Sequence, residues 1–508
     1  GTGALVKNGA GTLVLSGANT YSGGTTINAG TLQISNSSAL GAGMTSVKSG
    51  GILEATSAMT LNVSKLDIQK GSILKYGENA LTLNTDGKES TLNGNLNAPA
   101  TLTINGGGTL VFNGIHNASG GNSGERRGGS VWIENATLDL SQGGKLLADG
   151  WNSSAEVRVN QGGKLIINSW MYGDCLGGLG YETHFFINGG TVCVTATTSD
   201  DGGGRILTLQ GVGDHTNTLD AKADVNWTLL GEVKGAGSLT KTGAGTIILN
   251  HANTYSGGTI IKEGTVKAGN ITALGAGNVT INGGTLDATN KHLGNKITIQ
   301  GGKVSNFAKS GAGTLKEVSL LATNKDTNKT ITIDKSFLQA TTADSVKIGL
   351  GNQLIMMGGS TVTLGSAGQS NVATIALGQI NLTNGANQAA MTVTSGDTLT
   401  LAGTWTLDLS GFNPSENQDY VFQLISLTGT YADWAKDKLD LTYFTGFTIT
   451  GNDGFTVDNN TVKASLKNDG TVTLTYSGGP TPVVPEPSTV SLTLLALTGL
   501  LLRRRRAN

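Results

Sequence analysis

The chain has 508 residues, of which 78 are glycine and 6 are proline, and only 14% carry charge. Ordinary domains are about 25% charged and about 7% glycine, and collagen needs a Gly-X-Y period, so the composition excludes an ordinary cytosolic enzyme and a collagen. Apart from Arg503, Arg504, Arg505 and Arg506 the chain holds 30 basic against 35 acidic residues, which excludes the basic face of a nucleic-acid-binding protein. A hydrophobic fraction of 37% argues against disorder and leaves a regular all-β repeat.

The chain contains a long internal duplication. Residues 5–43 align with residues 239–277 at a constant offset of 234, and 24 of the 39 positions are identical. The shared text reads NGAGTLVLSGANTYSGGTTINAGTL in the first copy and TGAGTIILNHANTYSGGTIIKEGTV in the second. Such duplicated text predicts a duplicated structural unit.

A shorter period runs beneath the duplication. A phrase of Asn or Gln, two glycines, Thr or Lys, and an aliphatic residue appears as QGGKL at 142 and 161, NGGTV at 188, NGGTL at 282 and QGGKV at 300. The glycines supply a turn with positive φ, and the runs beside them alternate apolar with polar residues, as half-buried strands do. Neighbouring phrases commonly recur about every 20 residues, a period within the range of repeat proteins.

Short strands at this spacing, with Gly and Asn turns and little proline, predict the coils of a parallel β-helix that share one core. We predict this all-β solenoid over residues 1–400. A chain of β-sandwiches is the alternative, although its strands would recur at shorter spacing. The duplicated segment resembles the autotransporter-associated β-strand repeat, also called the passenger-associated transport repeat. This resemblance implies an exported, β-helical surface protein, often large and adhesive.

Three tryptophans, Trp132, Trp151 and Trp170, follow one another at an equal spacing of 19, the expected local coil length. Residues one coil apart lie above each other, and the apolar neighbours Val131 and Ile133 place Trp132 on the outer face. If exposed, the three rings form a ladder on which sugar rings stack. The alternative is an internal aromatic stack that fills the core.

Two cysteines, Cys175 and Cys193, are separated by close to one coil length. Stacked coils would bring them within disulfide distance, and an exported chain permits oxidation. The coil lengthens between Gly163 and Gly190, where the spacing of the glycine phrase rises from 19 to 27, and this would break that register. A bridge and two free thiols therefore both remain open.

The lengthened region, residues 170–215, is the best place for an active site, because loops on a rigid solenoid carry function. It contains the ionisable residues Asp174, Glu182, His184, Asp200, Asp201, Arg205, Asp214 and His215. Sequence adjacency does not give two carboxylates the separation that glycoside hydrolysis requires, and the alternative is a solvated loop. The chain lacks a phosphate-loop pattern, a GxSxG elbow and an HExxH motif, so we predict no enzyme activity.

We also predict no metal and no cofactor. The histidines His116, His184, His215, His251 and His292 are scattered along the chain. A lone polar residue at a repeat position is usually a substitution on the coil surface.

The glycine phrase fades near Leu401. Residues 401–477 are denser in apolar and aromatic residues and are predicted to form a compact β cap over the last coil, or else a separate binding module. Residues 478–488 hold four of the six prolines and are predicted to be an extended linker. Residues 489–508 combine a short apolar run, predicted as a short C-terminal transmembrane helix, with the four terminal arginines, which would stay cytoplasmic.

Pro485, Glu486 and Pro487, the apolar segment and the arginine block together resemble the PEP-CTERM sorting signal. This resemblance implies a Gram-negative host, export across the inner membrane, and recognition of Pro485, Glu486 and Pro487 by an exosortase that removes the anchor. It also implies a membrane intermediate and points to extracellular polysaccharide as a partner.

The sequence as a whole predicts a non-enzymatic, adhesin-like protein of the cell surface or extracellular matrix that contacts glycans or other cells. A polysaccharide-degrading β-helix enzyme (hydrolase or lyase) and a spacer that binds nothing are the alternatives.

Overall fold

The computed structural model describes residues 1–77, 79–97, 100–117, 130–147, 156–169, 184–199, 206–211, 216–307, 318–322, 330–340, 346–348, 353–357, 360–364, 373–376, 391–393, 398–408, 419–423, 425–427, 439–450, 462–466 and 471–476. Within these residues the regular elements are strands β1 to β47 and one 3₁₀ helix, η1 (Val63–Lys65). The predicted all-β class is confirmed. No helix in the described part of the chain has the length and apolar character needed to cross a membrane.

The chain divides into two compact units. The first comprises residues 1–321, 329–339 and 357–361, and the second comprises residues 322–328, 340–356 and 362–508. The first unit contains both copies of the duplicated segment. It is therefore the unit that carries the repeat architecture.

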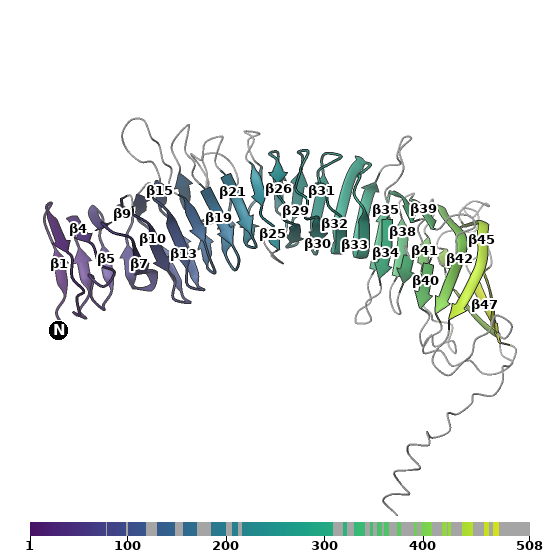
Figure 1. The fold of residues 1–508 in the computed structure, drawn as a ribbon, viewed down its shortest axis with the longest axis horizontal. Coiled ribbons are helices and arrows are strands. Elements are labelled where there is room, and N and C mark those ends of the chain that lie inside the picture. Colours follow the sequence, from purple (N-terminus) through teal and green to yellow (C-terminus); the bar gives the residue numbers. More distant parts are fainter. Residues whose placement is uncertain are drawn as a thin grey trace, which may run out of the picture. The chain divides into compact units, whose positions relative to one another are not determined.

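Most strands of the first unit lie in parallel sheets (Figure 1). One sheet joins β1 (Leu5–Lys7), β3 (Thr25–Ile27), β5 (Thr45–Val47) and β8 (Leu66–Ile68). A second joins β2 (Thr12–Leu15), β4 (Gly30–Ile34), β6 (Gly51–Ala55), β9 (Ile73–Tyr76), β12 (Asn95–Asn97), β15 (Ile115–Asn117) and β18 (Lys145–Leu147). A third joins β7 (Met59–Asn62), β10 (Leu81–Asn84), β13 (Leu102–Asn105), β16 (Val131–Ile133), β19 (Glu156–Asn160), β21 (His184–Asn188), β24 (Leu207–Leu209) and β27 (Val233–Lys234).

A longer row of strands forms the remaining sheet of this unit. It contains β11 (Glu89–Leu92), β14 (Thr109–Phe112), β17 (Thr137–Asp139), β20 (Lys164–Ile167), β22 (Thr191–Val194), β23 (Thr198–Ser199), β25 (Asn217–Ala221), β26 (Asn226–Leu229), β28 (Leu239–Thr242), β29 (Thr246–Leu249), β30 (Thr259–Ile261), β31 (Thr265–Ala268), β32 (Val279–Lys291), β33 (Ile297–Phe307), β34 (Val318–Ala322) and β35 (Thr330–Asp334). Strands β32 and β33 pair in parallel with their neighbours in this row.

The chain passes through three sheets in turn and then returns to the first. Strands β10, β11 and β12 are followed by β13, β14 and β15, and each pairs in parallel with the strand one coil later. Two parallel neighbouring strands need a long connection that returns the chain to the end at which the first strand began. Here the strands of the other two sheets form that connection. The parallel coils are compatible with a β-helix, and the predicted parallel pairing is confirmed.

Inward-facing apolar side chains form columns in the core of the first unit. In the third sheet one such column contains Leu81, Leu102, Val131, Val157, Phe185, Leu207 and Val233 in direct register. All seven are buried. Burying one such side chain contributes about 1.5–3 kcal/mol, so the alternation of apolar and polar residues along each strand stabilises the stack.

The coil length changes along the first unit. Leu5 pairs with Thr25 and Leu81 with Leu102, which matches the predicted period of about 20 residues. Lys164 pairs with Thr191, so the lengthened coil predicted before Gly190 is confirmed. The chain that lengthens these coils is inserted between strands, because the strand register on both sides is preserved.

A histidine and a tyrosine occupy the core of the first unit. His116 pairs with Leu96 and Leu146 in an inward column and is 1% exposed, so the prediction of a surface substitution is wrong at this position. Its Nε2 lies 2.6 Å from the hydroxyl oxygen of Tyr76, which is fully buried. Burial lowers the pKa of His116 to about 4. By contrast, His251 is exposed, as predicted.

We expect this pair to make the fold sensitive to acid. The folded pKa of His116 lies below its unfolded value of 6.5, so the unfolded chain binds more protons at mildly acidic pH and stability falls as pH drops from 6.5 towards 4. Between pH 7 and pH 5 the loss should be roughly 2 kcal/mol. Thermal unfolding at both pH values measures it, and the double variant Tyr76→Phe/His116→Leu should lose this part of the pH dependence. An unchanged dependence in that variant would assign the effect to other groups.

The second unit also contains parallel strands. They are β37 (Val346–Ile348), β38 (Gln353–Met357), β40 (Ala373–Ala376), β41 (Met391–Val393), β42 (Thr398–Asp408), β44 (Ile425–Leu427) and β45 (Leu439–Thr450). Strands β36 (Phe337–Ala340) and β39 (Thr361–Leu364) fall at the boundaries between the units. An antiparallel sheet of β43 (Asp419–Gln423), β47 (Thr471–Tyr476) and β46 (Val462–Leu466) departs from the parallel pattern.

The predicted cap, residues 401–477, contains both β45 and this antiparallel sheet, and its role as a cap stays a prediction. The predicted linker at 478–488 and the segment at 489–508, for which a transmembrane helix was predicted, lie outside the described residues.

Candidate functional site

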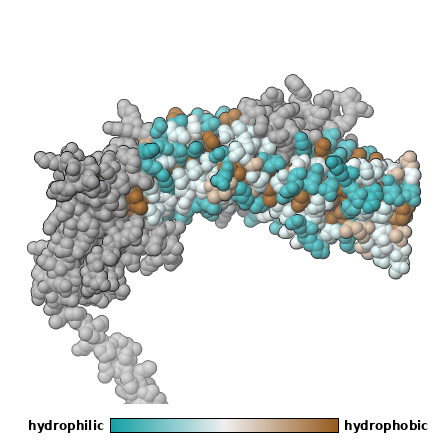
Figure 2. Space-filling model, turned by 180° about the vertical axis from the view of Figure 1, so that it is seen from behind, coloured by the Kyte–Doolittle hydropathy of each residue, from teal (hydrophilic) through white to brown (hydrophobic). Residues whose placement is uncertain are grey.

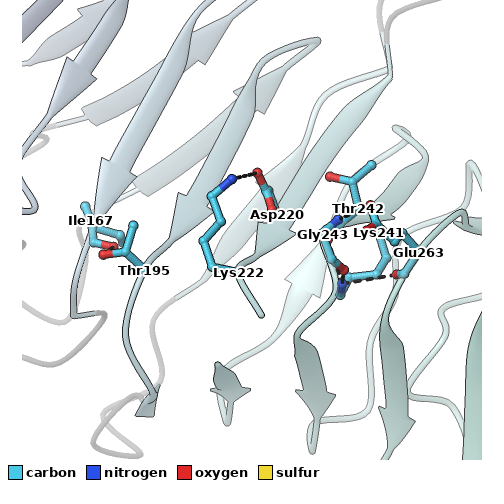
Figure 3. Close-up of polar contacts among 8 residues, drawn as sticks. All are labelled: Ile167, Thr195, Asp220, Lys222, Lys241, Thr242, Gly243 and Glu263. Carbon is cyan, nitrogen blue, oxygen red and sulfur yellow. Dashed lines mark hydrogen bonds and ion pairs between the residues drawn. The ribbon is translucent and has the colours of Figure 1, made fainter. Parts of the chain in front are cut away.

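Each copy of the duplicated segment contains a lysine that points into the coil and ties two turns together. Nζ of Lys241 donates hydrogen bonds to the carbonyl oxygens of Thr242 at 2.6 Å, Gly243 at 2.6 Å and Glu263 at 3.2 Å (Figure 3). Lys7 makes the same three contacts at the equivalent positions in the first copy, with Asn8 at 3.2 Å, Gly9 at 2.7 Å and Ala29 at 3.0 Å. We call this arrangement the lysine clamp.

The lysine clamp occupies a core position. Lys241 pairs with Leu219 on the preceding coil and Ile261 on the next, and its side chain is fully buried. Burial lowers the pKa of Lys241 to about 8, so the ammonium group remains charged at neutral pH. A buried ammonium is tolerated only where its protons are bound. The three carbonyl oxygens supply those partners.

A second set of contacts explains the NTYSGGT phrase. The hydroxyl oxygens of Tyr255 and Thr259 lie 2.6 Å apart, and the amide of Asn253 donates to the carbonyl oxygen of Ala273 at 2.6 Å. In the first copy Tyr21 and Thr25 lie the same 2.6 Å apart, and Asn19 donates to Ala39 at 2.8 Å. The phrase therefore connects each turn to the following coil.

Glycine is required where these turns touch. Gly264 has φ +65°, and a Cβ there would lie less than 3.0 Å from the carbonyl oxygens of Gly243 and Gly245. Gly30, its equivalent, has φ +69° and meets Gly9 and Gly11 in the same way. Only glycine combines this conformation with so close an approach of two backbones.

Beside the clamp, the outer side of the same sheet carries an ion pair. Nζ of Lys222 lies 3.2 Å from Oδ2 of Asp220 (Figure 3). Asp220 pairs with Cys193 on the preceding coil. Burial, followed by the negative charge of Asp220, raises the pKa of the Cys193 thiol to about 11. The thiol is therefore protonated at neutral pH and a poor nucleophile.

The structure places Cys193 between Ile166 and Asp220 in its ladder, so the sequence separation of the two cysteines does not correspond to one coil here. Cys193 is buried and forms no disulfide among the described residues. Cys175 lies outside the described residues, so the bridge and the two free thiols both stay predictions.

The outer face of the third sheet carries an aromatic column. Trp132 lies between buried Val131 and Ile133, which confirms the predicted outward orientation, and its side chain is half-buried. The next residues in register are Arg158 and then Phe186. Cζ of Arg158 lies 5.9 Å from the Trp132 ring centroid and 4.5 Å from that of Phe186. We call Trp132, Arg158 and Phe186 the outer column.

Polar side chains border the outer column on the same strands. Nε of Arg158 bonds to Oε2 of Glu156 at 2.5 Å. On the other side, Asn160 donates to Oε1 of Glu134 at 3.2 Å, and Asn188 follows Asn160 in register. Two carboxylates and one guanidinium therefore give this face a net negative charge.

The register of the described strands does not follow the 19-residue spacing of the predicted ladder. The coils here repeat after 26 residues, as between Ser130 and Glu156, rather than 19. Arg158 therefore takes the place next to Trp132 that the 19-residue spacing assigned to Trp151. Trp151 and Trp170 themselves lie outside the described residues.

Most of the predicted region 170–215 also lies outside the described residues. This holds for Asp174, Glu182, Asp200, Asp201, Arg205, Asp214 and His215, and His184 is described only as the first residue of β21. Pro485, Glu486, Pro487 and the arginines Arg503, Arg504, Arg505 and Arg506 lie outside as well. The described residues contain no group of three or more His, Cys, Asp or Glu side chains that would hold a metal ion.

The surface of the repeat unit is mixed in character. Figure 2 shows hydrophilic and neutral residues over most of the visible described face, with hydrophobic residues scattered between them. The large hydrophobic residues that are exposed in the described part are Val6, Val14, Met44, Ile115 and Ile271. The first three belong to the opening coils.

The sequence did not predict the lysine clamp. It also did not predict that Arg158 and Phe186 lie next to Trp132 in the outer column. A signal for the clamp was present, because Lys7 and Lys241 each follow an apolar residue by two positions and so share its inward face. Arg158 and Phe186 share the same outward parity as Trp132. The strand alignment needed to place them together was hidden by the long insertions.

Comparison with known proteins agrees with this architecture. Residues 5–34 and 239–268 match the family described as passenger-associated-transport-repeat. An alignment 464 residues long, which covers 80% of this chain, shows 28% identity to "Adhesin BmaC autotransporter" of Brucella suis biovar 1 (strain 1330). No solved structure matches the chain.

The chain spans 12% of the length of that adhesin. The two matched repeat segments contain both lysine clamps and both NTYSGGT phrases. In these segments the chain is similar to passenger-associated-transport repeats, and over most of its length it is similar to one part of an autotransporter adhesin.

Proposed function

We propose that this protein is exported and acts at the cell surface as an adhesin-like β-helical protein that contacts glycans or other cells. The observation that carries the proposal is the similarity to an autotransporter adhesin over 80% of the chain. The parallel coils and the two matched repeats support it, because both belong to the same stretch of sequence. A rigid stack presents an extended outer surface, which suits binding more than a single deep site.

The proposal includes the route of export. Pro485, Glu486 and Pro487 form the recognition segment for an exosortase-type enzyme, and Arg503, Arg504, Arg505 and Arg506 hold the tail on the cytoplasmic side. The apolar segment between them keeps the chain in the inner membrane until it is processed. The protein then reaches the cell surface or the extracellular matrix of a Gram-negative bacterium.

One experiment tests location and adhesion together. The full chain is expressed in a Gram-negative host that carries an exosortase, and protease accessibility on intact cells is measured beside adherence to polysaccharide-coated surfaces and to cultured cells. We expect surface exposure and increased adherence. The triple variant Pro485→Ala, Glu486→Ala, Pro487→Ala should remain in the inner membrane and lose both signals.

Other outcomes separate the alternatives. Surface exposure without any increase in adherence would favour a spacer. Release of new reducing ends from the coating, lost with Asp201→Asn, would replace the adhesin with a polysaccharide-degrading enzyme. An unprocessed chain in cells with an active exosortase would contradict the sorting route alone.

A further inference from the structure

We infer that Asn8 and Gly9 form a site of spontaneous deamidation, at which Asn8 converts to aspartate and isoaspartate and the first lysine clamp is loosened. The two residues directly follow β1, and both are exposed. Gly9 has φ +75°, and a Cβ there would meet nothing within 4 Å, so the space beside its main chain is open. The inference concerns a chemical change of the folded chain and does not depend on a role in adhesion.

The reaction needs only the chain and water. The main-chain nitrogen of Gly9 loses its proton to solvent and attacks Cγ of Asn8, which forms a cyclic succinimide. The bond between Cγ and Nδ2 breaks, and the nitrogen leaves as ammonia after it takes a proton from water. Water then opens the ring at Cγ to give aspartate, or at the main-chain carbonyl carbon to give isoaspartate. No atom is oxidised or reduced.

Two neighbouring side chains favour this attack. Nδ2 of Asn28, on the next coil, donates a hydrogen bond to Oδ1 of Asn8 at 2.7 Å. That oxygen carries the negative charge of the intermediate, and a donor already directed at it stabilises the charge. Nζ of Lys7 lies 3.2 Å from the main-chain oxygen of Asn8 and 2.7 Å from that of Gly9. A positive charge beside the Gly9 amide favours the loss of its proton.

The hydrogen bonding of the glycine amide distinguishes this site from a similar one. Asn93 and Gly94 repeat the arrangement, because Nδ2 of Asn113 donates to Oδ1 of Asn93 at 2.8 Å. However, Gly94 is buried, and its N–H donates to the carbonyl oxygen of Ile68 at 2.8 Å. Attack on Asn93 must first break that bond. The N–H of Gly9 has no acceptor among the residues that the structure describes.

The second copy of the duplicated segment lacks the reactive group. Thr242 stands at the position of Asn8 and has no side-chain amide, so the clamp of Lys241 cannot change in this way. In the first copy, isoaspartate adds one carbon atom to the main chain before Gly9. This carbon displaces the Gly9 carbonyl oxygen that Lys7 binds. Deamidation therefore loosens the clamp of one copy and leaves the other intact.

Peptide mapping of the full chain, kept folded in a mildly alkaline buffer, tests the inference. We expect Asn8 to convert at least about tenfold faster than Asn93, the internal control. Protein isoaspartyl methyltransferase should label the peptide that contains position 8, which identifies the succinimide route. Asn28→Ala should slow the conversion of Asn8 about fivefold. Asn8→Gln should abolish it, because the larger ring that glutamine must form closes far more slowly.

Hydrogen exchange of the aged protein follows the effect on the clamp. Protection of β1 and β3 should fall as isoaspartate accumulates, while β28 and β30 of the second copy keep theirs. An unchanged thermal unfolding midpoint shows that Asn28→Ala is folded. Equal conversion of Asn8 and Asn93, or equal conversion of Asn8 in the wild type and in Asn28→Ala, would overturn the inference. Constant protection of β1 after full conversion would overturn the loosening of the clamp.

Discussion

Replacing Gly264 with alanine is expected to unfold the second copy of the repeat locally, at a cost of more than about 3 kcal/mol. The residue has φ +65°, a conformation that a Cβ disfavours. The added methyl group would also lie less than 3.0 Å from two backbone carbonyl oxygens and from Nζ of Lys241. Backbone oxygens cannot rotate away as a side chain does, so the two coils must separate.

Hydrogen exchange of strands β28 to β31 measures this effect where it occurs, because repeat proteins open locally. Gly294→Ala is the matched control, since Gly294 is exposed and a Cβ there would meet nothing within 4 Å. Gly30→Ala should cause the same local loss in the first copy. Equal protection in Gly264→Ala and Gly294→Ala would show that the coils tolerate a side chain at their contact.

Replacing Lys241 with alanine should destabilise the same coil by about 3 to 5 kcal/mol. The change removes three partly buried hydrogen bonds to carbonyl oxygens and leaves a cavity between Leu219 and Ile261. Acceptors that are shielded from water keep part of their desolvation cost when they lose their donor. The thermal unfolding midpoint and the hydrogen exchange protection of β28 and β30 should both fall.

Lys262→Ala provides the control, because Lys262 is an exposed lysine close to the same turns. We expect it to change stability by no more than about 0.5 kcal/mol. If both lysine variants had equally small effects, the lysine clamp would be a consequence of the fold rather than a source of its stability.

The coil period was predictable from sequence because its causes are local. Paired glycines determine where the turns lie, and so the spacing at which Leu81 pairs with Leu102. The alternation of apolar and polar residues determines which side chains point inward, and so the outward position of Trp132. The identity of the residue next to Trp132 on the following coil could not be predicted from nearby residues. It depends on how much chain is inserted between strands, and a constant spacing of 19 cannot represent coils that repeat after 26 residues.

The inward positions of Lys241 and His116 were missed for a different reason. Lysine is usually exposed and histidine is intermediate in burial, and each is buried here because partners from distant residues meet it. Lys241 needs the carbonyl oxygen of Glu263, 22 residues away, and His116 needs the hydroxyl of Tyr76, 40 residues away. Such partners become visible only when the coils are aligned.

The parallel register of the coils also determines how such a protein can change in length during evolution. Removing or adding one complete coil joins two strands that already have the correct partner, face and direction, whereas half a coil would place strands of different sheets next to each other. The clamps of Lys7 and Lys241 have equivalent partners although they belong to different copies of the duplicated segment. Each copy of the duplicated segment therefore contains the hydrogen bonds that connect its own coils. Genetic exchange between repeats can lengthen or shorten the molecule without selection for a new core.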